Sequence, residues 1–257
     1  MRIYSNAYEL MSETGRNLVE MGHIVKPKTY QNKKIEGNDD MITRELICEQ
    51  YCLTSLPDPK VLMVYTKAEE WCKAEFKERV SGLPCNPGKA YLLRKEFWEE
   101  FLVPDQYTEG GVKFDYTYPE RINWLVKYMG ERMTKLEAII ELLKHDPDTR
   151  KAVLAIYNDA IDRNHYEGDA RIPCSMYYDF LIREDAKGEK VLNICYHQRS
   201  SDFIQHFGDD VYLAWMLMKY VADHVGIKPG YLYHTIDSLH AYKKDWWMLK
   251  TSIDDIK

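Results

Sequence analysis

The sequence lacks the patterns that mark membrane, secreted or zinc-binding proteins. No apolar run reaches the roughly 18 residues that a membrane-spanning helix needs. The first residues, "MRIYSNAYELMSETGRN", have neither the apolar stretch nor the small-residue cleavage site of a secretory signal. The six cysteines form no CxxC pair, so we expect no metal site. These absences predict a cytoplasmic protein whose cysteines are reduced thiols.

Positive charge is not in excess either. The net charge is −6 over 257 residues, which argues against direct binding to nucleic acid. An anionic ligand would therefore need a local cationic pocket. The chain also has no internal repeat, low-complexity run or evident linker, and 45% of its residues are hydrophobic. We expect a single domain that spans residues 1–257.

Apolar spacing predicts helices in the first half of the chain. Residues 6–21 have helical spacing and end at Gly22, and residues 41–53 carry apolar side chains at helical spacing. Residues 66–82 open with Thr66 and have Glu69 three places later, which is a capping-box pattern. From Pro119 onward, one long amphipathic helix is expected, with an apolar face formed by Ile122, Leu125, Met129, Met133, Leu136, Ile140 and Leu143.

The second half is rich in predicted strands, which we place at residues 152–158, 175–183, 190–198 and 230–242. Residues 210–226 form an almost wholly apolar helix that should be buried, and "KKDWWMLK" is a short amphipathic helix. The expected class is therefore α+β, with a mostly antiparallel or mixed sheet packed against helices.

Four clusters place polar or reactive groups at strand ends. Each has a plain explanation when taken alone: a buried small side chain, solvated charge, a turn, or satisfied polar groups. In chain order they comprise Arg150 and Lys151, then Cys174 after Pro173, then Arg199, Ser200 and Asp202, and finally His240 and Tyr242.

The order and spacing of these clusters change the interpretation. The segments "DPDTRKAVLAIYN", "IPC", "QRSSDF" and "DSLHAY" resemble the thymidylate synthase family from about residue 115 to 246, and more thinly back to about residue 26. Within that family, "REL" at 44–46 and "SLHAY" are most similar to the branch of phage deoxycytidylate hydroxymethylases. The resemblance implies a thymidylate synthase-like fold and a homodimer formed through the sheet.

The resemblance also implies a reaction. Family members transfer a one-carbon unit from 5,10-methylenetetrahydrofolate to carbon 5 of a pyrimidine nucleotide, after a thiolate has added to carbon 6. Cys174 occupies the matching position, and thiolates suit this covalent step because they are strongly nucleophilic. A nearby cation such as Arg199 would favour the thiolate.

Cationic residues are matched to the phosphate of the nucleotide. Arg199 and Ser200 match the phosphate-binding pair of the family, and arginine supplies paired donors for such a group. Arg150 and Lys151 match a pair that reaches across from the second subunit, with Lys151 in place of an arginine. Lys28 stands near another phosphate-binding position, although a solvated loop lysine is an open alternative there.

The remaining matches concern ribose, folate and proton transfer. His240 and Tyr242 match a pair that binds the ribose 3′-hydroxyl, and Asp202 matches an aspartate that contacts the folate pterin. Glu45 matches a glutamate that organises water and proton transfers. Tyr116 matches a tyrosine of the same water network, although Thr117 follows it where the family usually has glycine.

The position that reads the base favours cytosine. Counting from Arg199, the twelfth residue is Asp210, where thymidylate synthases have asparagine. A carboxyl group can accept from the amino group of cytosine and, if protonated, donate to its ring nitrogen. Each mispaired buried group would cost about 1–3 kcal/mol, which disfavours uracil opposite this side chain. An alternative is that Asp210 is simply an acid that complements the dipole of a helix N-terminus.

The product is less constrained. The chain has Ser175 and Asp179 where synthases have histidine and glutamine, and it ends in "TSIDDIK" rather than in a short apolar tail. A charged, less sealing terminus is compatible with water trapping the exocyclic methylene intermediate, which predicts a dCMP hydroxymethylase. A dCMP methylase, a CMP hydroxymethylase, a dUMP-using thymidylate synthase and a non-catalytic nucleotide-binding protein remain alternatives.

Overall fold

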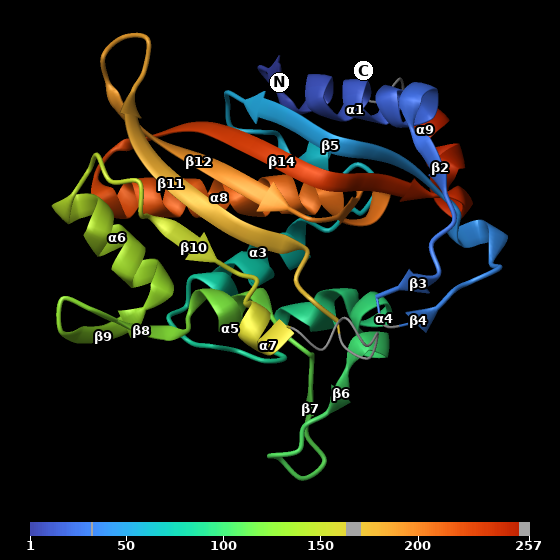
Figure 1. Cartoon of the computed structure of the whole chain (residues 1–257), viewed down its shortest axis with the longest axis horizontal. Helices are drawn as coiled ribbons and strands as arrows, with labels where there is room; N and C mark the ends of the chain where they lie inside the picture. The colour runs from blue at the N-terminus through green and yellow to red at the C-terminus, as the bar shows by residue number, and fades with distance from the viewer. Residues whose placement is uncertain (32, 163–170, 252–257) are drawn as a thin grey trace.

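A mixed β-sheet crosses the molecule in this computed structural model, which describes residues 1–31, 33–162 and 171–251 (Figure 1). The strand order is β1-β5-β14-β12-β11-β10, with β2 paired to β5 and β13 paired to β14. The pairs β10–β11, β11–β12, β5–β14 and β2–β5 are antiparallel, whereas β1–β5, β12–β14 and β13–β14 are parallel. The predicted α+β class with a mixed sheet is confirmed. No helix in the described part of the chain is long and apolar enough to cross a membrane.

The strands of this sheet are β1 (Arg2–Tyr4), β2 (His23–Val25), β5 (Thr43–Leu53), β10 (Val153–Ala155), β11 (Ser175–Glu184), β12 (Lys190–Gln198), β13 (Ser201–Asp202) and β14 (Lys228–Tyr242). The α-helices are α1 (Ala7–Met21), α2 (Pro59–Leu62), α3 (Glu69–Arg79), α4 (Lys95–Trp98), α5 (Tyr118–Ile122), α6 (Lys135–His145), α7 (Asp159–Asp162), α8 (Gly208–Val225) and α9 (Trp246–Thr251). Three small hairpins pair β3 (Thr29–Tyr30) with β4 (Lys33–Lys34), β6 (Val103–Pro104) with β7 (Val112–Lys113), and β8 (Leu125–Tyr128) with β9 (Glu131–Thr134).

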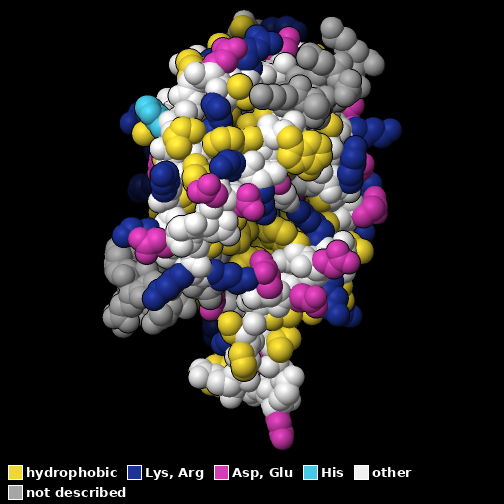
Figure 2. Space-filling view, turned by 90° about the vertical axis from the view of Figure 1, so that its right-hand side faces the viewer, with side chains coloured by type: hydrophobic (Ala, Val, Ile, Leu, Met, Phe, Trp, Pro, Cys, Tyr) yellow, Lys and Arg dark blue, Asp and Glu magenta, His cyan; other side chains and the backbone are white. Residues whose placement is uncertain are grey.

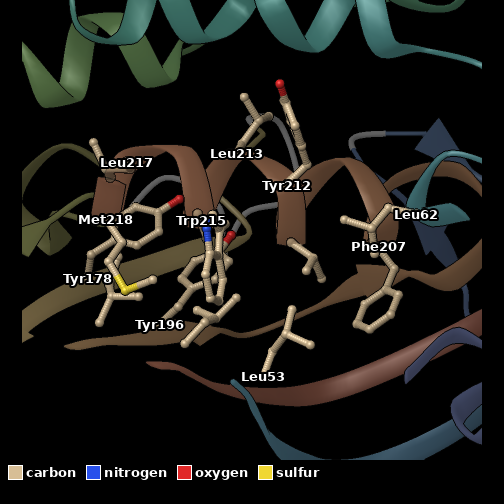
Figure 3. Close-up of a cluster of buried hydrophobic side chains, with 14 of the residues drawn as sticks. Leu53, Leu62, Tyr178, Tyr196, Phe207, Tyr212, Leu213, Trp215, Leu217 and Met218 are labelled. Carbon is tan, nitrogen blue, oxygen red and sulfur yellow. The ribbon is translucent and has the colours of Figure 1, made fainter. Parts of the chain in front are cut away.

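Helix α8 lies at the centre of the hydrophobic core, as its apolar sequence predicts. Trp215 and Met218 point from α8 toward the strands, whereas Leu213 points away from the sheet (Figure 3). The helix packs on both β14 and α3, so it is covered on opposite sides. Gly208 permits a close approach at its first turn, because a Cβ there would lie 1.9 Å from the carbonyl oxygen of Leu62. This packing fixes the N-terminus of α8, and with it the neighbouring Asp210, relative to the sheet.

The predicted strands around residues 152–158, 175–183, 190–198 and 230–242 are confirmed as β10, β11, β12 and β14. Helices α1 and α8 are confirmed as well: Asn6 caps α1 through the backbone N–H of Glu9, and Gly226 ends α8 with a φ of 85°. The "KKDWWMLK" segment forms a 3₁₀ turn followed by α9.

The helix expected at residues 41–53 is wrong, because this segment is strand β5. It pairs with β1, β2 and β14, and this tertiary pairing outweighs the local spacing. Cys48 has a φ of 55°, which interrupts the two-residue alternation of a regular strand. Tyr51, Cys52 and Leu53 are all buried as a result, so the apolar pattern does not show the period of a strand.

The single long helix expected after Pro119 is also wrong. The segment folds into α5, the β8–β9 hairpin and α6. The hairpin turns at Met129 and Gly130, which have φ values of 48° and 92°. Thr134 then caps α6 and forms a capping box with Glu137.

The capping box expected at Thr66 is not formed. Helix α3 begins at Glu69 with Ala68 as its N-cap. The hydroxyl of Thr66 instead donates a hydrogen bond to Asp209 at 2.9 Å. A polar side chain that the sequence suggested for local capping is thus used in a tertiary contact.

Candidate active site

A cavity of about 400 Å³ opens where strands of the sheet end beside the N-terminus of α8. One face of the molecule is hollowed, with hydrophobic side chains inside the hollow and charged side chains of both signs around it (Figure 2). The cavity brings together eight of the twelve residues predicted from sequence: Tyr116, Cys174, Arg199, Ser200, Asp202, Asp210, His240 and Tyr242.

Cys174 is held at the start of β11 by the end of β12. The backbone N–H of Arg199 donates to the carbonyl oxygen of Cys174 at 2.9 Å. The side chain of Arg199 donates to the carbonyl oxygens of Pro173 and Ile172 at 3.0 and 3.2 Å, and its Nη2 lies 3.9 Å from Sγ of Cys174. The cation is therefore fixed beside the sulfur by three backbone contacts.

Two opposing effects act on the Cys174 thiol. Burial raises its pKa, whereas the nearby guanidinium groups of Arg199 and Arg171 act to lower it. The carboxyl group of Asp210 raises the pKa further. Because the thiolate is the nucleophilic form, the two arginines are the groups of this site that favour reactivity.

Asp210 lies in the first turn of α8 and also lines the cavity. Its Oδ2 accepts hydrogen bonds from Nε2 of Gln198 at 2.8 Å and from the hydroxyl of Ser201 at 3.2 Å. Burial raises the pKa of this carboxyl group to about 6. The side chain is thus placed as a helix N-terminal acid and as a ligand-facing group at the same time, and the two interpretations do not compete.

Asp202 and His240 are neighbours across the sheet. The parallel pairing of β13 with β14 aligns Asp202 with His240. Oδ1 of Asp202 accepts from the backbone N–H groups of Ile204 and Gln205, which start a π-helical turn over Phe203–Phe207. Burial raises the pKa of Asp202.

Two tyrosines complete this side of the cavity. Tyr242 follows His240 on the same face of β14 and packs edge-on against Tyr30, with ring centroids 5.6 Å apart. Tyr116 is 8% exposed, and burial raises its pKa to about 12. Both phenols keep their protons at neutral pH, so each can donate a hydrogen bond into the cavity.

Comparison with known proteins identifies the family. The family model described as "Thymidylate synthase" matches residues 75–255. The chain belongs to the thymidylate synthase family.

Its relatives include a putative thymidylate synthase of Methanosarcina acetivorans, which is 31% identical over 163 residues that cover 63% of this chain and 69% of the relative. A deoxyuridylate hydroxymethyltransferase of Bacillus phage SP01 is 29% identical over 147 residues, or 55% of this chain and 37% of the relative. Among solved structures, the thermostable thymidylate synthase A of Bacillus subtilis matches with a TM-score of 0.73. At 15% identity over 97% of this chain and 84% of that one, this match shows the fold. The protein is a one-carbon transferase of the thymidylate synthase type, and this family uses methylenetetrahydrofolate and a nucleotide.

Glu45 lies outside the residues that line the cavity of this synthase-family protein. It is on β5, where its backbone is in register with His240 on one side and His23 on the other. Glu75 of α3 does line the cavity, and its carboxylate forms an ion pair with Arg79 at 2.9 Å. Of these two carboxylates, Glu75 is therefore the one that lines the cavity.

A sequence signal for Glu75 was available. Glu75 and Arg79 are four residues apart, the spacing of an ion pair on one helical face. Such pairs are usually exposed, yet the side chains of Glu75 and Arg79 are only 12% and 4% exposed. The guanidinium of Arg79 also stacks over the ring of Tyr118, 4.3 Å from its centroid. Only this burial distinguishes the pair from an ordinary surface pair.

Three predicted phosphate-binding residues lie outside the cavity of their own subunit. The side chain of Lys28 is 77% exposed and pairs with Glu36 at 3.2 Å. Arg150 and Lys151 are exposed after α6. Their predicted role across a dimer interface concerns a second copy of the chain, and it remains a prediction.

An aromatic wall was missed by the sequence analysis. Trp71 and Trp98 stack with ring centroids 5.8 Å apart, and Phe97 and Phe101 lie beside Trp98. Arg171 adds a cation to this wall, with its guanidinium 4.3 Å from the centroid of Phe101. Flat aromatic surfaces suit a fused heteroaromatic ring, so this wall fits the folate that the family uses.

Asp209 is a second buried carboxyl group beside Asp210. It accepts hydrogen bonds from Thr66 at 2.9 Å and from Arg94 at 2.8 Å. Burial raises its pKa to about 7 despite the positive charge of Arg94. The two contacts connect α8 to the segments on either side of α3. In the described residues, no group of three or more His, Cys, Asp or Glu side chains could hold a metal ion.

Proposed function

We propose that this protein is a deoxycytidylate hydroxymethyltransferase, which transfers a one-carbon unit from methylenetetrahydrofolate to carbon 5 of dCMP. The observation that carries the proposal is the buried carboxyl group of Asp210 in the cavity that also holds Cys174. Cytosine presents an unprotonated ring nitrogen and an amino donor at one edge, and at the same edge uracil presents a ring N–H and a carbonyl group. A carboxyl group whose pKa is about 6 can carry the proton that cytosine requires.

Cys174 supplies the nucleophile in this proposal. Its thiolate adds to carbon 6 of the pyrimidine, and the electron pair displaced from the 5,6 double bond makes carbon 5 nucleophilic. Carbon 5 then forms a bond to the one-carbon unit, loses its proton, and releases the folate to leave an exocyclic methylene group. Water adds to this methylene and gives up one proton, so that the electron pair of the exocyclic double bond passes to carbon 5. That pair re-forms the 5,6 double bond, and the carbon–sulfur bond breaks to release Cys174 as its thiolate.

Glu75 takes the proton-transfer role that the sequence had suggested for Glu45. Its carboxylate lines the cavity beside Tyr118 and Arg79, within the same pocket as Cys174. The ion pair with Arg79 holds this carboxylate in place, where it can accept a proton or orient water near the base.

The other predicted contacts follow the walls of the cavity. We assign the phosphate to Arg199 and Ser200, and the ribose hydroxyl to His240 and Tyr242, all of which line it. Asp202 is assigned to the pterin, on the side of the cavity that Tyr30 also lines. These assignments place the sugar-phosphate on the polar side of the pocket and the folate along the aromatic wall.

A homodimer formed through the sheet would complete the phosphate site. The family is typically dimeric. On the sheet of this chain, the hydrophobic residues Val153 and Tyr177 are 45% and 38% exposed, so they are available for contact with a second subunit. In such a dimer, Arg150 and Lys151 of the partner subunit would add positive charge to the phosphate already held by Arg199. A buried dianion needs several cations, because one guanidinium leaves part of its charge uncompensated.

The hydroxymethyl product is supported by a relative. The phage SP01 protein that matches over 147 residues is a deoxyuridylate hydroxymethyltransferase, so water-trapping occurs among the relatives of this chain. The archaeal matches named putative thymidylate synthases favour a second candidate, which is methyl transfer with reduction of the intermediate by the folate. The C-terminal segment "TSIDDIK", on which the sequence argument for water relied, lies almost wholly outside the described residues.

The test uses dCMP and dUMP carrying tritium at carbon 5, each incubated with the protein and methylenetetrahydrofolate. We expect release of tritium from dCMP, a 5-hydroxymethyl product by mass spectrometry, and no absorbance change from dihydrofolate. Formation of dihydrofolate with a 5-methyl product would replace hydroxymethyl transfer by methyl transfer. Release from dUMP without release from dCMP would refute the proposal.

A further inference from the structure

A buried chain of hydrogen bonds runs from the core of the sheet to the carboxyl group of Asp210. The hydroxyl of Tyr51 lies 2.7 Å from Nδ1 of His234, and Nε2 of His234 lies 2.9 Å from Oε1 of Gln198. Nε2 of Gln198 then donates to Oδ2 of Asp210 at 2.8 Å. Tyr51 and Gln198 are 0% exposed and His234 is 1% exposed, so the first three members of this relay have no contact with solvent.

The buried Tyr51 end of this chain of hydrogen bonds determines which partner donates in each of them. In the described structure, the hydrogen bond of the Tyr51 hydroxyl is the one to His234, and burial raises the pKa of this phenol well above its usual value. The phenol therefore keeps its proton and satisfies it by donating to Nδ1. His234 is neutral, because burial lowers its pKa to about 3, so its single ring proton must lie on Nε2.

This direction is transmitted to Asp210 by the amide of Gln198. The N–H of His234 requires the amide oxygen of Gln198 to face the histidine, and the amide nitrogen must then face Asp210. Ser201 reinforces the arrangement, because its hydroxyl donates to the same oxygen, Oδ2, at 3.2 Å. Oδ2 thus has two fixed donors directed at it, and rotation of the carboxyl group would break both hydrogen bonds.

A free carboxylic acid does not distinguish cytosine from uracil by itself. It has one donor and one acceptor oxygen, and exchanging the two oxygens converts the pattern that cytosine needs into the pattern that uracil needs. Discrimination therefore depends on which oxygen carries the proton. With Oδ2 held as an acceptor, the proton of the neutral acid belongs on Oδ1.

We infer that Tyr51, His234 and Gln198 form a positioning relay that determines which pyrimidine the enzyme accepts, by fixing the proton of Asp210 on one carboxyl oxygen. The inference rests on the proposed function, in that Asp210 reads the edge of the base. The three residues act through Asp210 and lie outside the lining of the cavity in the described chain. Aromatic packing keeps the relay in place: the ring of Tyr196 stacks on His234 with centroids 4.4 Å apart.

The test compares Tyr51→Phe and Gln198→Met with the matched control Tyr4→Phe. Tyr4 is also buried and its ring lies 6.0 Å from that of Tyr51, but its hydroxyl has no place in the relay. For each protein, kcat/KM is measured by tritium release from both dCMP and dUMP, and thermal melting reports folding. Tyr51→Phe removes a single oxygen atom; if it fails to fold, Gln198→Met decides.

Without the phenolic donor, His234 can place its proton on Nδ1, the amide of Gln198 can turn, and Oδ2 can become a donor. We expect the ratio of kcat/KM for dCMP over dUMP to fall about fivefold in Tyr51→Phe and about tenfold in Gln198→Met, as for loss of one buried hydrogen bond. Tyr4→Phe should keep the wild-type ratio within twofold. A merely structural role would lower both values of kcat/KM together and leave their ratio unchanged.

The outcomes separate the relay from the proposed function. Unchanged ratios in both relay variants, with a wild-type enzyme that prefers dCMP, would overturn the relay and leave the proposed function standing. A wild-type enzyme that prefers dUMP would overturn the proposed function. The relay would then stand if the same two variants weakened that preference, and would fall if they did not.

Discussion

Replacement of Asp210 by asparagine, combined with Gln198→Met, should reverse the preference for the base. The carboxyl group and the amide have nearly the same size, so the fold and the cavity should be retained. Without Gln198, which now donates to Oδ2 at 2.8 Å, the amide can turn its amino group toward the hydroxyl of Ser201, which lies 3.2 Å from Oδ2. The amide oxygen then takes the place of Oδ1, where it accepts from the ring N–H of uracil and cannot donate to cytosine.

The magnitude follows from the number of mispaired groups. Cytosine presents two polar groups at this edge, and each one left unpaired in a buried site costs about 1–3 kcal/mol. Together they would lower kcat/KM for dCMP by roughly 30-fold to 10⁴-fold, at about 1.4 kcal/mol for each factor of ten. The same amide matches uracil, so kcat/KM for dUMP should rise.

The assay is tritium release from carbon 5 of each nucleotide, with wild type, Gln198→Met and the double variant Asp210→Asn, Gln198→Met compared at equal concentration. Circular dichroism and thermal melting check that the variant is folded. If the folded variant kept its activity on dCMP and gained none on dUMP, Asp210 would not be the residue that reads the base.

Three further outcomes are expected. Cys174→Ala should lower tritium release at least 10³-fold and leave the melting temperature within a few degrees, since it removes the nucleophile from the cavity wall; retained activity would exclude covalent catalysis by this residue. Glu75→Gln should lower kcat about 100-fold, whereas the kcat of Glu45→Gln should stay within about threefold of the wild-type value. If Glu45→Gln were instead the more damaging change, the proton-transfer role would belong to Glu45. The pKa of Asp210 in the folded protein, about 6, lies above that of an unfolded aspartate, about 4, so this group stabilises the fold below pH 4 and its contribution is lost as the pH rises through 6. The free energy of unfolding of Asp210→Asn minus that of wild type, measured by urea unfolding, should therefore be about 2–3 kcal/mol larger at pH 7.5 than at pH 4. A difference that does not change with pH would contradict the raised pKa.

Much of the fold follows from local pattern. The buried helix α8 and the long strands β11, β12 and β14 carry consistent signals over many residues, with clear limits such as Gly226. The order of short motifs was also sufficient to indicate the family, which the match over residues 75–255 confirms. Eight of the predicted site residues converge on one cavity. Seven lie at strand ends or in the first turn of α8, where the sheet topology brings them together, and Tyr116 lies in the segment just before α5.

Other features depend on contacts that are distant in sequence. Strand β5 resembled a helix because Cys48 breaks the alternation, and only its pairing with β14, about 190 residues later, defines it as a strand. Glu75 lines the cavity because α3 packs on α8, whereas Glu45, which was chosen from the resemblance of a short motif, lies on β5 outside the cavity lining. The choice of which carboxyl oxygen of Asp210 carries the proton is a third case, since it depends on Tyr51 and His234, whose positions are fixed by the register of the sheet. The amino-acid sequence alone determined which reactive groups the protein carries and the periodic elements that hold them, because these depend on neighbouring residues. The tertiary structure decided which carboxylates face the ligand and how they are protonated, because burial and hydrogen-bond direction depend on residues far apart in the chain.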